Sequence, residues 1–144
     1  MRLSHIVREI LESVEYRGYH KAPNKDRGAP LHDLTQIYPQ DIYSNKAVAY
    51  YGDNGGYADK ESVRIIHAAK DQPDKLIKIY RAVPKNLENV DINDGDWVTI
   101  NKKYAEIHGE RSFDNEYKII SKEVPAKHLY TDANSIHEFG YDPN

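Results

Sequence analysis

The sequence contains no cysteine. Without thiols the chain can form no disulfide bond and no zinc–thiolate site, and it offers no cysteine nucleophile. Methionine and tryptophan occur once each and phenylalanine twice, whereas tyrosine occurs 12 times. Because tyrosine covers half-exposed surfaces and stacks on planar ligands, this composition predicts either a tyrosine-rich cleft or a tyrosine rim around a small core.

Long apolar runs are also missing. No stretch approaches the roughly 20 apolar residues of a transmembrane helix, and no apolar signal core follows Met1, so we expect no membrane contact and a cytoplasmic location. The formal net charge is −3, whereas proteins that bind duplex DNA usually carry a basic surplus. The seven histidines show no spacing typical of a metal site, and we expect no metal ion.

The 144 residues, 39% of them hydrophobic and 30% charged, suit one domain with one core. Apolar residues at helical spacing predict an N-terminal amphipathic helix in residues 1–14. Residues 15–30 lack periodicity and carry glycines, prolines and basic side chains, so we expect an exposed basic loop, either close to a phosphate or merely solvated. Residues 31–144 then form the main domain.

Within this domain, helical patterns come first and strand patterns later. Asp33 or Asp41 can open short helical turns, and residues 61–70 predict a helix that ends before Pro73. Further elements are expected as strands at 76–83, 97–100, 117–124, 128–131 and 136–141, and as a helix at 102–108 stopped by Gly109. This order predicts an α+β fold with a split, mostly antiparallel sheet.

Three short segments, each with a polar residue of interest, stand at the ends of apolar runs in the last part of the chain. Arg81 lies in the segment Tyr80–Pro84, Thr99 ends the segment Gly95–Thr99, and Glu138 lies in Asn134–Tyr141. An arginine, a hydroxyl and a carboxylate at strand-like positions can bind a phosphorylated ribose and stabilise positive charge on a sugar. NAD chemistry is therefore the leading hypothesis.

These segments, together with Leu31–Thr35, Tyr50–Gly52 and Tyr104–Gly109, resemble in their order the ADP-ribosyltransferase domain of phage polyvalent proteins. The active site of this branch follows an Arg–Ser/Thr–Glu order. The resemblance covers residues 31–144 and implies the ADP-ribosyltransferase fold, with NAD as co-substrate. It also implies a phage-encoded or prophage-encoded mono-ADP-ribosyltransferase that modifies a host protein or nucleic acid and releases nicotinamide.

The resemblance implies a role for each polar residue. Glu138 would be the catalytic carboxylate that stabilises positive charge on the ribose, although a lone strand glutamate is usually a surface residue. Arg81, followed by Ala82, would bind NAD through its phosphate and ribose, because a guanidinium suits bidentate phosphate binding; otherwise Arg81 reaches solvent from a strand end. Thr99 would support the ribose or orient Glu138, or is an ordinary strand residue.

Tyr50 and Tyr51 would lie over the cationic nicotinamide, or they form the core and rim of a helix end. Tyr104 could play the same role, but its helical position next to Ala105 favours the core. Strand alternation would direct His137 away from Glu138, which argues against a His–Glu pair. Ile136 stands where arginine-modifying members carry an acidic or amide residue, so the acceptor is open: another side chain, a nucleic acid, a small molecule or water.

Three other interpretations remain. The same residues would serve an NAD glycohydrolase, in which water accepts the ADP-ribose. A catalytically inactive family member would instead act by binding a host factor. Finally, the resemblance could fail, leaving a generic α+β domain.

Overall fold

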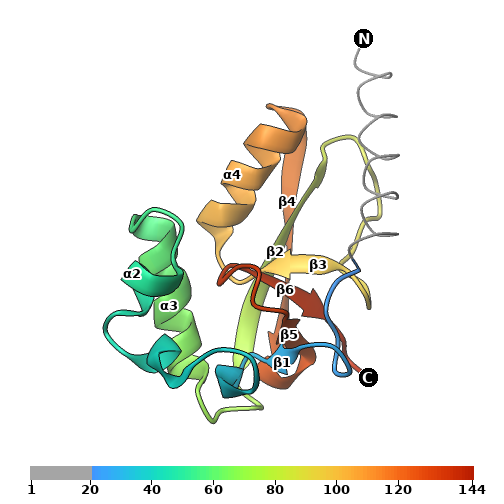
Figure 1. Cartoon of the computed structure of the whole chain (residues 1–144). Helices are drawn as coiled ribbons and strands as arrows, with labels where there is room; N and C mark the ends of the chain where they lie inside the picture. The colour runs from blue at the N-terminus through green and yellow to red at the C-terminus, as the bar shows by residue number, and fades with distance from the viewer. Residues whose placement is uncertain (1–20) are drawn as a thin grey trace.

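The computed structural model describes residues 21–144, so the helix expected in residues 1–14 lies outside the described part (Figure 1). The α+β prediction is confirmed. Residues 21–144 contain three α-helices and one six-stranded sheet, with the strand order β1-β5-β6-β3-β2-β4. All strand pairings are antiparallel.

The described chain begins without regular structure and then joins the sheet at its edge. Residues 21–28 form neither helix nor strand, whereas β1 (Ala29–Pro30) pairs with β5 (Leu129–Thr131). The last two residues of the predicted basic loop therefore belong to the sheet. The short helix η1 (Leu34–Gln36) follows, and Asp33 caps it as predicted by accepting a hydrogen bond from the Thr35 amide.

The helical part of the chain continues through η2 (Gln40–Tyr43) and α2 (Ala47–Tyr51) to α3 (Tyr57–Ala69). Helix α3 buries an apolar stripe that includes Val63 and Ile66, as the sequence pattern predicts. It begins four residues before the predicted start. The additional turn is polar on the outside, so apolar spacing alone does not reveal it.

The sheet has two parts that meet at a single residue pair. Strands β2 (Leu76–Pro84) and β4 (Tyr117–Pro125) pair over nine residues. Strand β3 (Trp97–Thr99) joins β2 only at the pair Tyr80–Thr99, and on its other side it pairs with β6 (Glu138–Tyr141). Figure 1 shows β3 and β6 running across the long β2–β4 ribbon.

Helix α4 (Lys102–Phe113) connects the two parts of the sheet and packs against β2 and β4. The prediction that Gly109 stops this helix was wrong, because the helix continues to Phe113. Gly109 is buried beneath Tyr117, and a Cβ atom there would lie 2.5 Å from Cδ2 of that ring. This glycine therefore allows close packing of helix on strand and does not end the helix.

The core lies between the helices and the sheet. Its largest fully buried apolar side chains come from the helical half and the sheet alike: Leu31, Leu34, Ile42, Ile66, Ile79, Ile92, Ile100, Leu129, Ile136 and Phe139. Burial of each such side chain contributes about 1.5–3 kcal/mol to stability. The short helix η3 (Ala126–His128) leads from β4 into β5. Within residues 21–144, every helix is too short or too polar to cross a membrane.

Candidate active site

Three side chains form a row across the middle of the sheet. Tyr80 on β2 lies opposite Thr99 on β3, and Thr99 lies opposite Glu138 on β6. Directly paired residues of antiparallel strands project to the same face. The fold therefore brings Thr99 and Glu138 together, although they are far apart in the sequence.

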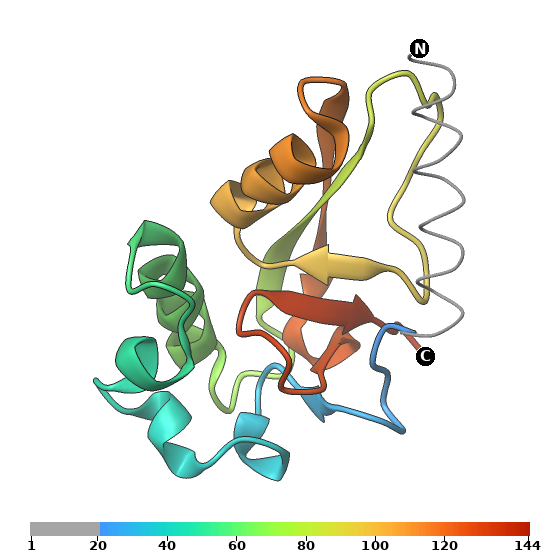
Figure 2. The same cartoon turned by 45° about the horizontal axis from the view of Figure 1, so that its top comes forward.

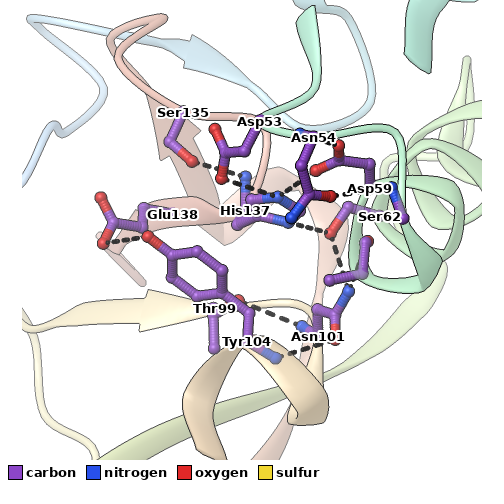
Figure 3. A network of polar contacts seen from close by, with 12 residues as sticks. Asp53, Asn54, Asp59, Ser62, Thr99, Asn101, Tyr104, Ser135, His137 and Glu138 are labelled. Carbon is purple, nitrogen blue, oxygen red and sulfur yellow. Dashed lines mark hydrogen bonds and ion pairs between the residues drawn. The ribbon is translucent and has the colours of Figure 1, made fainter. Parts of the chain in front are cut away.

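The Glu138 carboxylate is held by a tyrosine from helix α4. The Tyr104 hydroxyl donates a hydrogen bond to Oε1 of Glu138 at 3.0 Å (Figure 3). Tyr104 lies in the first turn of α4, and the side chain of Asn101 caps this turn by accepting from the Tyr104 amide at 3.1 Å. The sequence analysis favoured a core position for Tyr104, but the half-buried tyrosine contacts the candidate catalytic carboxylate.

A buried polar network contacts the other side of the Tyr104 ring and supports this arrangement (Figure 3). The His137 ring stacks on Tyr104 with ring centroids 4.5 Å apart. Its Nδ1 atom lies 2.7 Å from the Ser62 hydroxyl, and its Nε2 atom lies 2.9 Å from Oδ1 of Asp59. The Asn101 amide donates to the same Ser62 hydroxyl at 3.2 Å. The network therefore connects helix α3, the start of α4 and the residue before Glu138.

Ser62, His137 and Asp59 have the order of a nucleophile, base and acid, but all three are at most 1% exposed. No substrate could reach the Ser62 hydroxyl in this position. The hydrogen-bond directions are consistent with a donor chain from Asn101 to Ser62 to His137 Nδ1, while the Nε2 hydrogen is donated to Asp59. We interpret the group as a positioning device for the segment that carries Glu138.

The loop of residues 52–56 wraps around the Asp59 carboxylate. Oδ2 of Asp59 accepts hydrogen bonds from the amides of Asn54 and Gly55 at 2.8 and 2.6 Å. Burial alone would raise the pKa of Asp59, but the backbone donors, followed by His137, lower it below its usual range. Gly55 has a φ of +75°, a backbone conformation that favours glycine. Asp59 is therefore ionised and fixed.

The surroundings of Tyr104 are acidic. Burial, followed by the charge on Glu138, raises the pKa of Tyr104, and Asp53 contributes in the same direction. The phenol thus remains protonated at neutral pH and continues to donate to Glu138. Asp53 also lies near His137, with Oδ2 3.5 Å from Nε2. Carboxylates therefore concentrate negative potential on this side of the sheet.

Arg81 is near this row but not part of it. It follows Tyr80 directly, and successive strand residues point to opposite faces. Its Nη1 atom donates to the Trp97 carbonyl at 2.7 Å, which connects β2 to the far end of β3. Arg81 and the neighbouring half-buried Ala82 thus lie where β2 and β3 diverge.

Thr99 itself is engaged within the protein. The Thr99 hydroxyl accepts a hydrogen bond from the Asn101 backbone amide at 3.2 Å.

Tyr50 and Tyr51 lie in α2 and occupy different environments. Tyr50 is 57% exposed. Tyr51 packs at the edge of the core, where its ring meets Tyr38 edge-on and its hydroxyl donates to Asp41. This placement agrees with the rim-and-core interpretation of the pair. Stacking on nicotinamide remains a prediction.

Asp53, Asp59 and His137 form a group whose ligand atoms lie within 4.8 Å of one another. Their geometry would suit a metal ion, although their sequence spacing does not suggest one. Asp59 already accepts two amides and a histidine, and these interactions satisfy its charge. The group is complete as a hydrogen-bonded network, and we assign it a structural role.

Sequence analysis missed most of this supporting network. Asn directly before an apolar helical pattern is a recognised N-cap signal, so the role of Asn101 in opening α4 could have been predicted. Ser62 and Asp59 carry no such signal, because their partner His137 lies more than 70 residues away in the sequence.

No protein-family model matches the chain, and no curated protein or solved structure matches it either. The functional argument therefore rests on the residues and their geometry.

Proposed function

We propose that this protein is an NAD-dependent mono-ADP-ribosyltransferase of the Arg–Ser/Thr–Glu type, with an ADP-ribosyltransferase-like sheet. The observation that carries the proposal is the placement of Glu138. This half-buried carboxylate begins β6, lies opposite Thr99 and is held by the Tyr104 hydroxyl. The strands that carry Arg81, Thr99 and Glu138 are immediate neighbours in the sheet, in the order β2, β3, β6.

ADP-ribosyl transfer breaks the bond between the nicotinamide nitrogen and C1′ of the ribose. A new bond forms between C1′ and the acceptor, which gives up a proton. Positive charge develops on the ribose in the transition state, and a fixed carboxylate stabilises that charge. Glu138 is the group proposed for this task, and Tyr104 keeps its carboxylate in one orientation.

The electrostatics around Glu138 also favour the proposed substrate. NAD carries its positive charge on the nicotinamide ring, and here the Glu138 carboxylate lies beside Tyr104 and the Asp53 carboxylate beside His137 (Figure 3). Arg81 alternates to the face of β2 opposite Tyr80, so it would bind the phosphates by reaching past the end of β3, where its guanidinium meets the Trp97 carbonyl. Thr99 would contact the ribose beside Glu138, and Tyr50 or Tyr51 would cover the nicotinamide.

The proposed biological setting follows from the sequence resemblance. The enzyme would be encoded by a phage or prophage and would act on a protein or nucleic acid in the host cytoplasm. Ile136, two residues before Glu138, is fully buried. Because its side chain is also apolar, it offers no polar group to an arginine acceptor. If water accepts the ADP-ribose, the same site is that of an NAD glycohydrolase.

The test is incubation of the protein with adenylate-labelled NAD and a host-cell lysate, with Glu138→Gln beside it. Loss of a stabilising carboxylate of this kind should slow NAD cleavage by roughly 10²–10³-fold. Glu123→Gln is the matched control, because Glu123 is an exposed glutamate on β4. Label on a discrete macromolecule that depends on Glu138 supports the transferase, and free ADP-ribose alone supports the glycohydrolase.

An Arg81→Ala variant separates binding from chemistry in the same assay. If Arg81 binds the phosphates, the KM for NAD should rise about tenfold or more while kcat changes less. Arg111→Ala is the control, because Arg111 is exposed at the far end of α4. No NAD cleavage by the folded wild-type protein, with or without lysate, would contradict the proposed function.

A further inference from the structure

A groove of about 600 Å³ lies between α3, β2 and α4. Figures 1 and 2 both show α3 and α4 as separate helices on the same side of β2. The groove begins beside the candidate active site, because its wall includes Tyr80, which lies opposite Thr99. It also includes Asn101, which caps the helix that carries Tyr104. Thr99, Tyr104 and Glu138 do not line the groove, so Tyr80 and Asn101 are the residues that connect it to the candidate active site.

The groove is basic although the whole chain has a net charge of −3. Five basic side chains line it: Arg64, Lys75, Lys78, Lys102 and Lys103. Its acidic side chains are Glu61 and Glu106. Glu61 is engaged in an ion pair with Arg64, so four lysines are opposed by Glu106 alone. Positive charge is therefore concentrated in this groove.

Within residues 21–144, few interactions account for the lysines of the groove. Among residues 21–144, Lys75, Lys102 and Lys103 form no ion pair. Lys78 lies over the Tyr80 ring, with Nζ 5.9 Å from the ring centroid. Exposed lysines are common, but several of them converging on one groove can neutralise an anionic ligand.

Two of these lysines stand where a helix disfavours them. Lys102 and Lys103 occupy the first turn of α4, which contains no acidic residue. The positive end of the helix dipole lies there, and a like charge costs about 0.3–1 kcal/mol. Such a local conflict between sequence and structure is expected where function requires it. A bound phosphate would convert the repulsion into attraction.

Apolar and aromatic surface lies beside the positive charge. Among the described residues, the exposed large hydrophobic side chains are Ile37, Tyr50, Tyr57 and Leu76. Tyr57 is 70% and Leu76 61% exposed, and both line the groove. Tyr80 adds a half-buried ring to the wall. Aromatic rings beside lysines are typical of surfaces that stack bases and neutralise phosphates of single strands.

We propose that this groove binds single-stranded nucleic acid, with phosphates on Lys75, Lys102 and Lys103 and bases on Tyr57 and Tyr80. The volume lies in the range of small-ligand sites, so it admits a short stretch of strand. We further infer that this strand is the acceptor of ADP-ribose, because Tyr80 of the groove wall belongs to the same row as Thr99 and Glu138. The acceptor role rests on the proposed function, whereas the binding role does not.

Binding is tested by fluorescence anisotropy of a short labelled oligouridylate, with an oligothymidylate, a DNA duplex and a polyglutamate peptide for comparison. The groove variant is Lys102→Gln with Lys103→Gln, which removes charges that the helix disfavours and so should not harm folding. The control is Lys46→Gln with Lys85→Gln, two lysines that are exposed and do not line the groove.

Neutralisation of about three phosphates should weaken single-strand binding roughly 20-fold between about 50 and 200 mM salt. The groove variant should bind at least tenfold more weakly and show a smaller salt slope, while the control variant binds like the wild type. Tyr57→Ala should also weaken binding, because stacking contributes about 1–3 kcal/mol per base. Equal binding by the groove variant, or tighter binding of the peptide or the duplex, would overturn the proposal.

The acceptor role is tested with the same oligonucleotides and labelled NAD. We expect label on the oligonucleotide that requires both Glu138 and the two lysines of the groove. Glu138→Gln should bind the strand normally but transfer no label. NAD cleavage without label on any strand would overturn the acceptor role alone. Strand binding without NAD cleavage would overturn the proposed function and the acceptor role with it, and would leave the groove as a binding site.

Discussion

The Tyr104 hydroxyl on α4 donates a hydrogen bond to Glu138 on β6, and the same tyrosine ring stacks on His137. One side chain thus contacts both the candidate catalytic carboxylate and the buried network behind it. The contact joins two segments 34 residues apart. It makes the orientation of Glu138 dependent on how α4 is seated on the sheet.

Tyr104→Phe should therefore reduce NAD turnover without unfolding the protein. The phenylalanine keeps the stacking surface but removes a hydrogen bond to a charged group, which contributes about 1.5–3 kcal/mol. We expect kcat/KM to fall about tenfold to 100-fold. Tyr117→Phe is a matched control, because Tyr117 also donates to a glutamate, Glu110, but at the exposed surface. A Tyr104→Phe variant with full activity would remove Tyr104 from the site.

The buried network makes a separate prediction for stability. Ser62→Ala removes the hydroxyl that bonds His137 and accepts from Asn101. A buried polar group left without its partner costs about 1–3 kcal/mol, and urea unfolding should show a loss of this size. Ser121→Ala is the control, because Ser121 is exposed on β4 and should change stability by less than about 0.5 kcal/mol. Equal stability of the two variants would show that the network contributes little.

The elements that sequence analysis predicted correctly are those with a strong local pattern. The run from Leu76 to Val83 and the run from Tyr117 to Val124 are β2 and β4, each one residue longer than predicted. The Asp33 cap was also correct. These features depend on neighbours in sequence, so periodicity and capping residues reveal them.

The features that were missed depend on distant partners. Gly109 was taken as a helix stop because glycine disfavours helices, but its close packing with Tyr117 outweighs that preference. The contact of Tyr104 with Glu138 was missed because the position of Tyr104 in the helix is also typical of a core residue. Thr99 and Glu138 were named from the sequence, but their shared row is visible only from the strand register.

Gly109→Ala should test the packing explanation. In an open helix this change would stabilise the protein by up to about 1 kcal/mol. Here the new Cβ would lie 2.5, 2.6 and 2.8 Å from three atoms of the Tyr117 ring, including Cγ, which cannot swing away easily. We expect a net loss of about 1–3 kcal/mol in chemical unfolding.

Tyr117→Ala provides the second half of this test. In that background the ring is absent, and Gly109→Ala should become neutral or stabilising. The coupling between the two substitutions should therefore reach about 1 kcal/mol or more in a double-mutant cycle. Additive effects would mean that Gly109 is required for another reason.

The raised pKa values of two tyrosines predict how the free energy of unfolding changes at alkaline pH. Burial raises the pKa of Tyr38 to about 12, and the hydrogen bond to Asp41, with burial, raises that of Tyr51 to about 12. In the unfolded chain both groups titrate near 10. Below about pH 10 they are protonated in both states and do not make stability depend on pH. Between about pH 10 and 12 only the unfolded chain loses these protons, so the contribution of the two tyrosines to the free energy of unfolding falls.

Urea unfolding at a series of pH values, followed by circular dichroism, measures this slope, and Tyr38→Phe isolates one group. The variant lacks a hydroxyl, so it should be less stable than the wild type by a constant amount up to about pH 10. Above that pH the difference should shrink, because the wild type loses the Tyr38 contribution and the phenylalanine has no proton to lose. A difference that stays constant to pH 12 would mean that Tyr38 ionises equally easily in the folded and unfolded states.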